Sequence, residues 1–247
     1  MKITVVTICY NSENTIRKTI ESVLNQTYNE LEYIIQDGKS VDSTCEIIER
    51  YTRDERVRFY SEPDKGIYDA MNRALDRASG NYIIYMNSGD VFYNEYVIEK
   101  MINYLVSDIV YGSTLRHMIH QDVVEQYKGK YHLIRLLLMG RMPCHQSIFV
   151  KTELMRKFRF DETYSICADY DFIVRAYSSN ILFKYENMIV SEVDNVNGVS
   201  SQPENLSNMR QQDDRALKKS LPTLYYITII PKLIYRVLKK IEQNMVA

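Results

Sequence analysis

The turn that follows an apolar run at residues 82–86 ends on a carboxylate that can bind a metal ion. The run begins at Tyr82, changes abruptly to Asn-Ser-Gly and closes on Asp90. Such a run is typical of a buried strand, and the turn would display Asp90 at the strand's carboxyl end, where open α/β sheets bind ligands. Mn²⁺ or Mg²⁺ bridging two phosphates needs only one or two protein carboxylates. Asp90 is therefore a candidate metal ligand, and a plain surface turn is the structural alternative.

Three more candidate strands in the amino-terminal half also end on polar residues. They are Ile3 to Cys9 before Tyr10 and Asn11, Leu31 to Gln36 before Asp37, and Val57 to Tyr60 before Asp64 and Lys65. Helical patterns lie between them, one over 16–24 with Ser12 or Asn14 as its cap, and one over 67–78 ended by Gly80. Strand and helix alternate at spacings that fit right-handed crossovers, which predicts a parallel, doubly wound sheet.

The second half of the chain is expected to complete this sheet. The patterns predict a helix over 96–105, a short strand over 108–111, a polar hairpin or loop over 115–130, an apolar segment over 131–139 and a strand over 143–150. The last of these would present His145 and Gln146 at its start. A helix opens at Asp169, where a carboxylate is stabilised by the helix dipole.

Two of the carboxylates have specific chemical uses besides structural ones. Asp37 accepts hydrogen bonds only, so it can pair with a ring N–H, which uracil and guanine offer on their pairing edges and adenine does not. Asp169 can take a proton from a hydroxyl group if it lies within hydrogen-bond reach. The structural alternatives are a turn at Asp37 and a helix cap at Asp169.

Five segments in this order resemble the inverting family 2 glycosyltransferases with a GT-A fold. They are 4–11, 36–44, 64–72, 87–90 and 168–172, and the resemblance covers about residues 1 to 195. The third and fourth segments are similar to the bacterial colanic-acid and capsule biosynthesis branch. The resemblance implies a mixed, mostly parallel α/β sheet flanked by helices, with a Rossmann-like amino-terminal half. It also implies transfer of a sugar from a nucleoside diphosphate sugar to a saccharide acceptor in surface polysaccharide biosynthesis.

The resemblance also implies roles for individual residues. Asp169 would be the base of a single displacement, with the leaving group stabilised by a metal at Asp90 and by Arg175 or Lys65. A UDP-sugar donor is favoured, and a GDP-sugar stays open. The donor or acceptor would also be contacted by a wider set: Thr7, Tyr10, Asn11, Asp37, Asp64, Asp69, Asn72, Asn87 and His145. Arg73 and Arg77 are expected on a solvated face.

The sequence departs from the family pattern at three acidic positions. Asn87 and Gly89 replace carboxylates of the usual metal motif, and Ala168 replaces the Glu before the expected base. The losses leave a second hypothesis open, a non-catalytic nucleotide-sugar-binding protein. A sugar-phosphate nucleotidyltransferase would need a glycine-rich, basic loop after the first strand, and residues 9–13 do not form one.

Composition favours one soluble domain that does not bind nucleic acid. The chain has 247 residues, 45% hydrophobic, with a formal net charge of -1. We expect a catalytic domain over 1–219, with a donor-binding half at 1–111 and an acceptor half at 112–219. The four cysteines have no Cys-x-x-Cys spacing, which favours reduced thiols in the cytoplasm and no zinc.

Residues 220–247 have the pattern of an amphipathic basic helix. Lys232, Arg236, Lys239 and Lys240 fall on one face, opposite an Ile- and Leu-rich face. This pattern favours peripheral binding to the anionic inner leaflet of a bacterial membrane, where a lipid-linked acceptor would lie. Packing on the protein's own core and formation of a homodimer are the alternatives.

Overall fold

The computed structural model describes residues 1–117, 122–125, 133–134, 137–194, 202–227 and 229. The basic residues expected to bind a membrane, from Lys232 onward, lie outside this range, as do residues 131, 132, 135 and 136 of the apolar segment 131–139. Within the described residues, no helix has both the length and the apolar character needed to cross a membrane.

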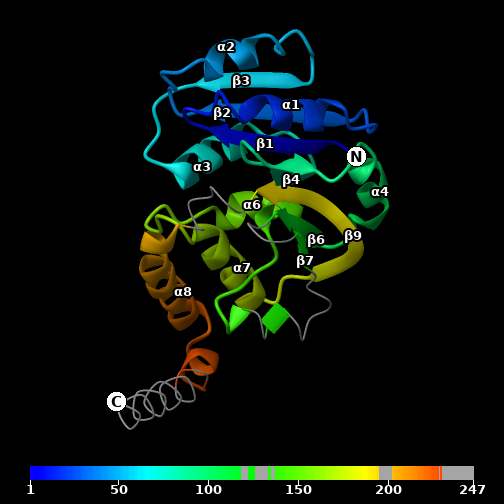
Figure 1. The fold of residues 1–247 in the computed structure, drawn as a ribbon. Coiled ribbons are helices and arrows are strands. Elements are labelled where there is room, and N and C mark those ends of the chain that lie inside the picture. The colour runs from blue at the N-terminus through cyan, green and yellow to red at the C-terminus, as the bar shows by residue number, and fades with distance from the viewer. Residues whose placement is uncertain (118–121, 126–132, 135–136, 195–201, 228, 230–247) are drawn as a thin grey trace.

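The described strands form one mixed sheet that runs through both halves of the chain. Its order is β3-β2-β1-β4-β8-β6-β9-β5, with β7 paired to β6 (Figure 1). Pairing is parallel from β3 to β4 and between β6 and β9, and antiparallel elsewhere. The strands are β1 (Ile3–Cys9), β2 (Leu31–Asp37), β3 (Val57–Ser61), β4 (Tyr82–Tyr85), β5 (Val91–Phe92), β6 (Ile109–His117), β7 (Asp122–Glu125), β8 (Ile148–Lys151) and β9 (Phe183–Asp194).

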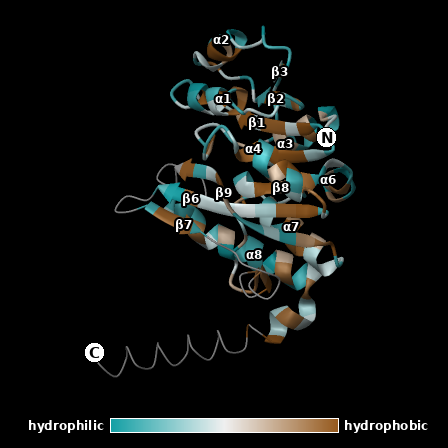
Figure 2. Ribbon diagram, turned by 90° about the vertical axis from the view of Figure 1, so that its right-hand side faces the viewer, coloured by the Kyte–Doolittle hydropathy of each residue, from teal (hydrophilic) through white to brown (hydrophobic). Residues whose placement is uncertain are grey.

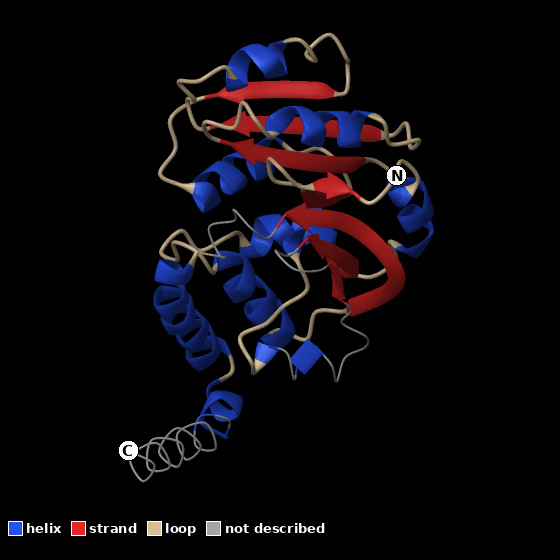
Figure 3. Cartoon of the chain, in the orientation of Figure 1, coloured by secondary structure: helices blue, strands red, loops and turns tan. Residues whose placement is uncertain are grey.

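Helices cover both faces of this sheet (Figure 3). They are α1 (Ile16–Leu24), α2 (Thr44–Glu49), α3 (Ile67–Arg77), α4 (Val97–Met101), α6 (Thr152–Phe158), α7 (Ala168–Ser178) and α8 (Leu206–Ser220). Short 3-10 turns are η1 (Ile102–Tyr104), η2 (His145–Ser147) and η4 (Pro203–Asn205). The prediction of a mixed, mostly parallel sheet flanked by helices is confirmed.

Alternation along the buried strands produces two apolar clusters, one on each face. In β1, Val5 and Cys9 belong to the cluster that includes α1 and α4, whereas Val6 and Ile8 belong to the cluster that includes α3 and α7. Successive side chains of a strand point to opposite faces, so a strand buried on both faces is apolar throughout. Figure 2 shows this hydrophobic colour in β1.

Several predicted boundaries need correction. The predicted strand at 143–150 begins only at Ile148, because η2 occupies His145 to Ser147. Helix α1 has Thr15 at its N-cap position without a side-chain cap bond, so neither Ser12 nor Asn14 caps it. Gly80 does not end α3, which stops at Arg77. The glycine is needed because a Cβ there would lie 2.6 Å from the backbone nitrogen of Thr4.

The hairpin predicted within 115–130 is present in part. Strand β6 continues to His117, well beyond the expected end at 111, and pairs with β7 in antiparallel fashion. Its long parallel partner β9, which curves around the lower half of the molecule in Figure 1, was not predicted.

Gly112 of β6 provides a test of this packing. A Cβ there would lie 2.5 Å from the carbonyl oxygen of Met188, a backbone atom that cannot rotate away. We expect Gly112→Ala to lower the free energy of unfolding by about 1–3 kcal/mol, the usual cost of overpacking. Urea unfolding measures the change, and the exposed Asn103→Ala is the control. Equal stability of the two variants would contradict the close β6–β9 contact.

Candidate active site

The predicted site residues of the first half gather where β1, β2 and β4 end. The Gly38 amide donates to the Cys9 carbonyl at 2.9 Å, and the Ser88 amide to the Ile8 carbonyl at 3.4 Å. The turn after β2 and the turn after β4 therefore flank the end of β1. This is the edge at which parallel α/β sheets bind ligands.

Tyr10, Gly38 and Asp64 lie together on the β2 side of this edge. A Cβ on Gly38 would lie 2.6 Å from Asp64 Oδ2 and 3.4 Å from the Tyr10 ring, which is 61% exposed. Asn11 is held beside them, because its backbone N–H donates to Ser40 Oγ and its Oδ1 accepts from the Val41 amide. The structure thus brings three predicted site residues, Tyr10, Asn11 and Asp64, to one place.

Asp37 lies beneath this surface, fully buried. Its carboxylate accepts from the Ser40 amide and hydroxyl, from Ser61 Oγ at 2.7 Å and from Cys45 Sγ at 3.3 Å. Burial raises its pKa, but these hydrogen bonds outweigh burial and leave the pKa below its usual value. Direct pairing of Asp37 with the uracil or guanine ring of a nucleotide therefore requires displacement of one of these donors.

Thr7 and Asn72 are structural residues rather than surface contacts, which corrects their predicted roles. Thr7 is fully buried, and its Oγ1 donates to the Met86 carbonyl at 2.7 Å. Asn72 is 2% exposed, and its amide exchanges hydrogen bonds with the backbone of Phe160. The side-chain polar groups of Thr7 and Asn72 thus make hydrogen bonds to backbone groups inside the protein.

Asp69, in the first turn of α3, holds the loop that carries Asp64 and Lys65. Asp69 Oδ2 accepts from the Lys65 amide at 2.9 Å and pairs with Arg73 at 2.9 Å, while Lys65 itself is exposed. Arg73 is thus not simply solvated, and neither is Arg77, which lies over the Tyr60 ring and pairs with Glu62.

A continuous hydrogen-bond network joins the turn after β4 to the start of α7. His145 and Gln146 of η2 are at its centre. His145 Nε2 lies 2.9 Å from Asn87 Nδ2, and its Nδ1 lies 3.2 Å from Asp169 Oδ2. Because an amide nitrogen can only donate, Nε2 accepts and Nδ1 carries the proton that is donated to Asp169. Gln146 Nε2 donates to Asp90 Oδ2.

Asp169 has the surroundings of an ionised carboxylate that is still accessible. Besides His145, its oxygens accept from the Tyr170 amide at 2.9 Å and lie 3.1 Å from the Tyr68 hydroxyl. Burial raises its pKa, but the bond from His145 and the other donors lower it below the usual value. A carboxylate has about four acceptor positions. Its side chain is 22% exposed, so a hydroxyl group can reach it.

Asp90 has the opposite electrostatic character. It is 7% exposed, and burial raises its pKa to about 6 despite the Gln146 bond and the positive charges nearby. Asn87 Oδ1, in the same turn, is buried and has no hydrogen-bond partner. Carboxylate and amide oxygens are ligands that Mg²⁺ and Mn²⁺ accept, so these two residues fit a divalent ion. Across the described residues, no group of three His, Cys, Asp or Glu could hold a metal.

Arg175 does not belong to this group, which corrects its predicted role. Its Nε donates to Asp171 at 2.6 Å, and its other nitrogens donate to the carbonyls of Phe158 and Arg159 at 2.7 Å. Asp171 is fully buried. The guanidinium therefore neutralises a buried carboxylate and ties α7 to the end of α6.

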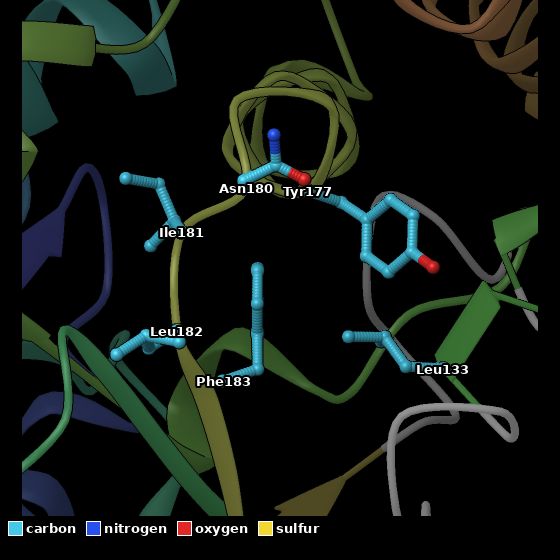
Figure 4. Close-up of a pocket in the computed structure, with 6 residues that line it drawn as sticks. All are labelled: Leu133, Tyr177, Asn180, Ile181, Leu182 and Phe183. Atoms are coloured by element: carbon cyan, nitrogen blue, oxygen red, sulfur yellow. The ribbon is translucent and has the colours of Figure 1, made fainter.

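Residues of α7 line parts of two cavities. The first, about 20 Å³, is lined by apolar side chains, including Phe172 and Ile173, and reaches His145 and Asp169. The second, about 140 Å³, is lined by residues such as Tyr177, Asn180 and Phe183 (Figure 4). Asp169 lies in the first turn of α7 and Asn180 lies beyond its end at Ser178, so the larger cavity is at the other end of the helix from the network.

Sequence reasoning missed Tyr68 and undervalued Gln146. The Tyr68 hydroxyl contacts Asp169 and the Gln146 amide contacts Asp90, and both contacts join residues that are far apart in the sequence. Gln146 stands next to His145, and Tyr68 lies within the segment 64–72 that carries the resemblance, so each had a signal in the sequence.

Comparisons with known proteins find related sequences and folds. The sequence model described as Glycosyl transferase family 2 matches residues 4–178. A Mycobacterium tuberculosis protein named PGL/p-HBAD biosynthesis glycosyltransferase is 28% identical over 190 residues, covering 74% of this chain and 72% of the relative.

Two solved structures share the fold at low sequence identity. S. aureus TarS 1-349 in complex with UDP-GlcNAc has a TM-score of 0.70 and 20% identity, covering 90% of this chain and 68% of that chain. Mannosyltransferase PcManGT from Pyrobaculum calidifontis, in complex with GDP-Man and Mn2+, has a TM-score of 0.64 and 14% identity, covering 100% and 81%.

Replacing Arg175 separates a structural role from a functional one. We expect Arg175→Gln to lower the free energy of unfolding by about 3–5 kcal/mol, because it leaves buried Asp171 without its cation. Nucleotide affinity, measured by calorimetry below the unfolding temperature, should stay unchanged. If Arg175→Gln were stable but bound nucleotide more weakly, Arg175 would again be a candidate for stabilising the leaving group.

Asp90 predicts a pH dependence of stability in metal-free buffer. The folded-state pKa of about 6 lies above the ordinary value of 3.8, so the folded state binds more protons between these values. Stability therefore falls as pH rises through this window. We expect the parent to lose about 1 kcal/mol between pH 5 and pH 7 relative to Asp90→Asn, which lacks the titrating group. Urea unfolding of both proteins at pH 5 and pH 7 in EDTA measures this. An equal change in the free energy of unfolding for the parent and Asp90→Asn would contradict it.

Proposed function

Because the chain belongs to glycosyl transferase family 2, we propose that it transfers one sugar, with inversion, from a nucleoside diphosphate sugar to a saccharide hydroxyl. The observation that carries this proposal is the network centred on η2, which places an accessible ionised carboxylate and a candidate metal turn on either side of one short segment. Inverting transfer needs one base and one site for the departing diphosphate, so no second nucleophilic carboxylate is required.

Asp169 acts as the base in this proposal. The acceptor hydroxyl donates to the open acceptor position of Asp169 and attacks the anomeric carbon as its proton passes to the carboxylate. The C–O bond to the diphosphate breaks on the opposite face of the sugar. His145 is a positioning residue, since its Nδ1–H holds Asp169 Oδ2 in place.

Asp90 and Asn87 would hold Mn²⁺ or Mg²⁺ with the diphosphate completing the ligand set. When bound, the ion neutralises the negative charge of the leaving nucleoside diphosphate. Gln146 orients the Asp90 carboxylate toward this task through its hydrogen bond.

The donor nucleotide is proposed to bind along the exposed ring of Tyr10, beside Asn11 and Asp64. A UDP-sugar is favoured, in line with the UDP-GlcNAc bound to TarS, and a GDP-sugar is the alternative, in line with the GDP-Man bound to PcManGT. For the acceptor we propose a lipid-linked saccharide of a surface polysaccharide, reached at the cytoplasmic membrane surface through the basic carboxyl-terminal segment.

The decisive experiment measures release of nucleoside diphosphate from UDP-sugars and GDP-sugars, with and without saccharide acceptor, in Mn²⁺ and in EDTA. An enzyme releases product slowly even without acceptor, whereas a non-catalytic binding protein does not. Asp169→Asn should lose roughly 10²-fold or more in turnover while keeping its donor affinity, because loss of a general base affects the chemical step.

The matched control is Asp171→Asn, since Asp171 lies on the same helix but pairs with Arg175. Its effect should appear in stability and not in turnover per folded molecule. Normal turnover in Asp169→Asn with a true acceptor would exclude Asp169 as the base. Binding of a nucleotide sugar without any turnover would favour the binding-protein hypothesis.

A further inference from the structure

The ion pair between Arg116 of β6 and Glu125 of β7 has no role in the arrangement described so far. Arg116 Nε lies 2.6 Å from Glu125 Oε2, and the two side chains are 21% and 30% exposed. The pair lies within the segment that sequence patterns predicted as a polar hairpin or loop. Its position on the sheet relates it to the candidate active site.

Strand register places this pair on the face that contacts η2. Thr114 is opposite Glu125 in the β6–β7 ladder, and Thr114 Oγ1 lies 2.7 Å from Ser147 Oγ of η2. Residues two apart on a strand share a face, and directly opposed residues also share one. Arg116 and Glu125 therefore lie on the face of the hairpin that Thr114 turns toward Ser147.

Arg116 and the residues bound to Gln146 lie at one edge of the sheet. Gln146 donates to Asp90, and its Oε1 accepts from Cys144 Sγ at 2.6 Å. Strands β4 and β6 both pair with β8 in antiparallel fashion, so they run in the same direction, and Arg116 near the end of β6 lies at the same edge of the sheet as the turn after β4 that carries Asp90. Arg116 is thus close to the turn that carries the candidate metal ligand.

Arg116 can supply the positive charge that the family resemblance implied for Arg175. Arg175 is committed to Asp171 and two backbone carbonyls, and the turn before Asp90 offers an amide and a glycine where the family pattern has carboxylates. A guanidinium presents a planar fork of donors that matches phosphate oxygens in two-point contacts. In the structure Glu125 is the negatively charged partner of Arg116. A phosphate group could replace Glu125 as that partner, or bind the guanidinium together with it.

We propose that Arg116 is a diphosphate-binding residue, whose guanidinium leaves or shares Glu125 to bind the β-phosphate of the donor beside Asp90. This inference rests on the proposed function and adds a residue to it. Glu125 acts as a counter-ion that holds the guanidinium in place until the diphosphate arrives. The β6–β7 hairpin is then part of the donor site, on the side of Asp90 away from Tyr10.

Calorimetry with UDP, UMP, GDP and GMP in Mg²⁺ tests the proposal without requiring an acceptor. A contact to the β-phosphate affects diphosphates and not monophosphates. We expect Arg116→Gln to weaken binding of the preferred diphosphate about tenfold or more and to leave the monophosphate unchanged, as loss of a charge-assisted hydrogen bond implies. Arg116→Lys should fall between, because the charge stays and the fork is lost.

Two further variants separate this role from a structural one. Glu125→Gln breaks the ion pair in the same way as Arg116→Gln, yet it should retain or strengthen diphosphate binding. His117→Gln alters the opposite face of β6, where His117 contacts Asp122 and Glu192, and should leave both affinities unchanged. Equal weakening by Glu125→Gln and Arg116→Gln would mean that the pair only stabilises the hairpin.

The outcomes distinguish this inference from the function on which it rests. If the parent protein binds no nucleoside diphosphate, the proposed function itself fails. If the parent binds one and Arg116→Gln, with an unchanged melting temperature, binds it equally well, only the role of Arg116 is overturned. An equal loss for UDP and UMP would overturn the assignment to the β-phosphate.

Discussion

The short turn η2 fixes the distance between the two carboxylates on which the proposed chemistry depends. His145 and Gln146 are consecutive residues, and one binds Asp169 while the other binds Asp90. The turn is itself held by the Ser147 amide, which donates to the Cys144 carbonyl at 2.9 Å, and by the Ser147 hydroxyl between β6 and β9. Movement of either half of the chain therefore strains a buried hydrogen bond, and the two carboxylates keep their separation.

The same turn gives the two carboxylates different acidities. Asp169 receives hydrogen bonds from an imidazole and a backbone amide, and these lower its pKa in spite of burial. Asp90 has Gln146 as its side-chain donor, so burial dominates and its pKa rises to about 6. Environments that separate the pKa values of two carboxyl groups are typical of groups with different tasks. The lowered pKa of Asp169 suits the proposed base, and the raised pKa of Asp90 suits a carboxylate that is stabilised when it binds a cation.

Local patterns predicted the first half of the fold well and the second half less well. The strands at Ile3–Cys9 and Leu31–Asp37 are β-branched runs that end in turn residues, so their signal is contained in a few consecutive positions. Strand β9 carries Lys184, Glu186 and Glu192 among its residues and curves through a bulge, so no clean alternation marks it. Its pairing with β6 depends on residues about 70 positions apart.

The site predictions failed where a distant segment supplies the partner. Asn72 has the right spacing to face the edge of the sheet, but the backbone of Phe160 takes up its amide. Arg175 likewise is bound by carbonyls at the end of α6. Turn residues such as Tyr10 and Asp64 lie together near Gly38, because the end of a strand fixes their position without reference to the rest of the chain.

The three departures from the family's acidic pattern each have a local physical reason. Asn87 donates to His145 Nε2, so the proton donated to Asp169 is on Nδ1, whereas an Asp at position 87 could not donate to Nε2. Gly89 has a φ of 101°, which a β-carbon would strain, and its amide donates to Thr19 Oγ1. Ala168 is fully buried at the start of α7, so a Glu side chain would have to displace packed core atoms. The three replacements therefore fit the local structure of the turn after β4 and the start of α7, while Asp90 and Asp169 remain as the carboxylates of the proposed metal binding and proton transfer.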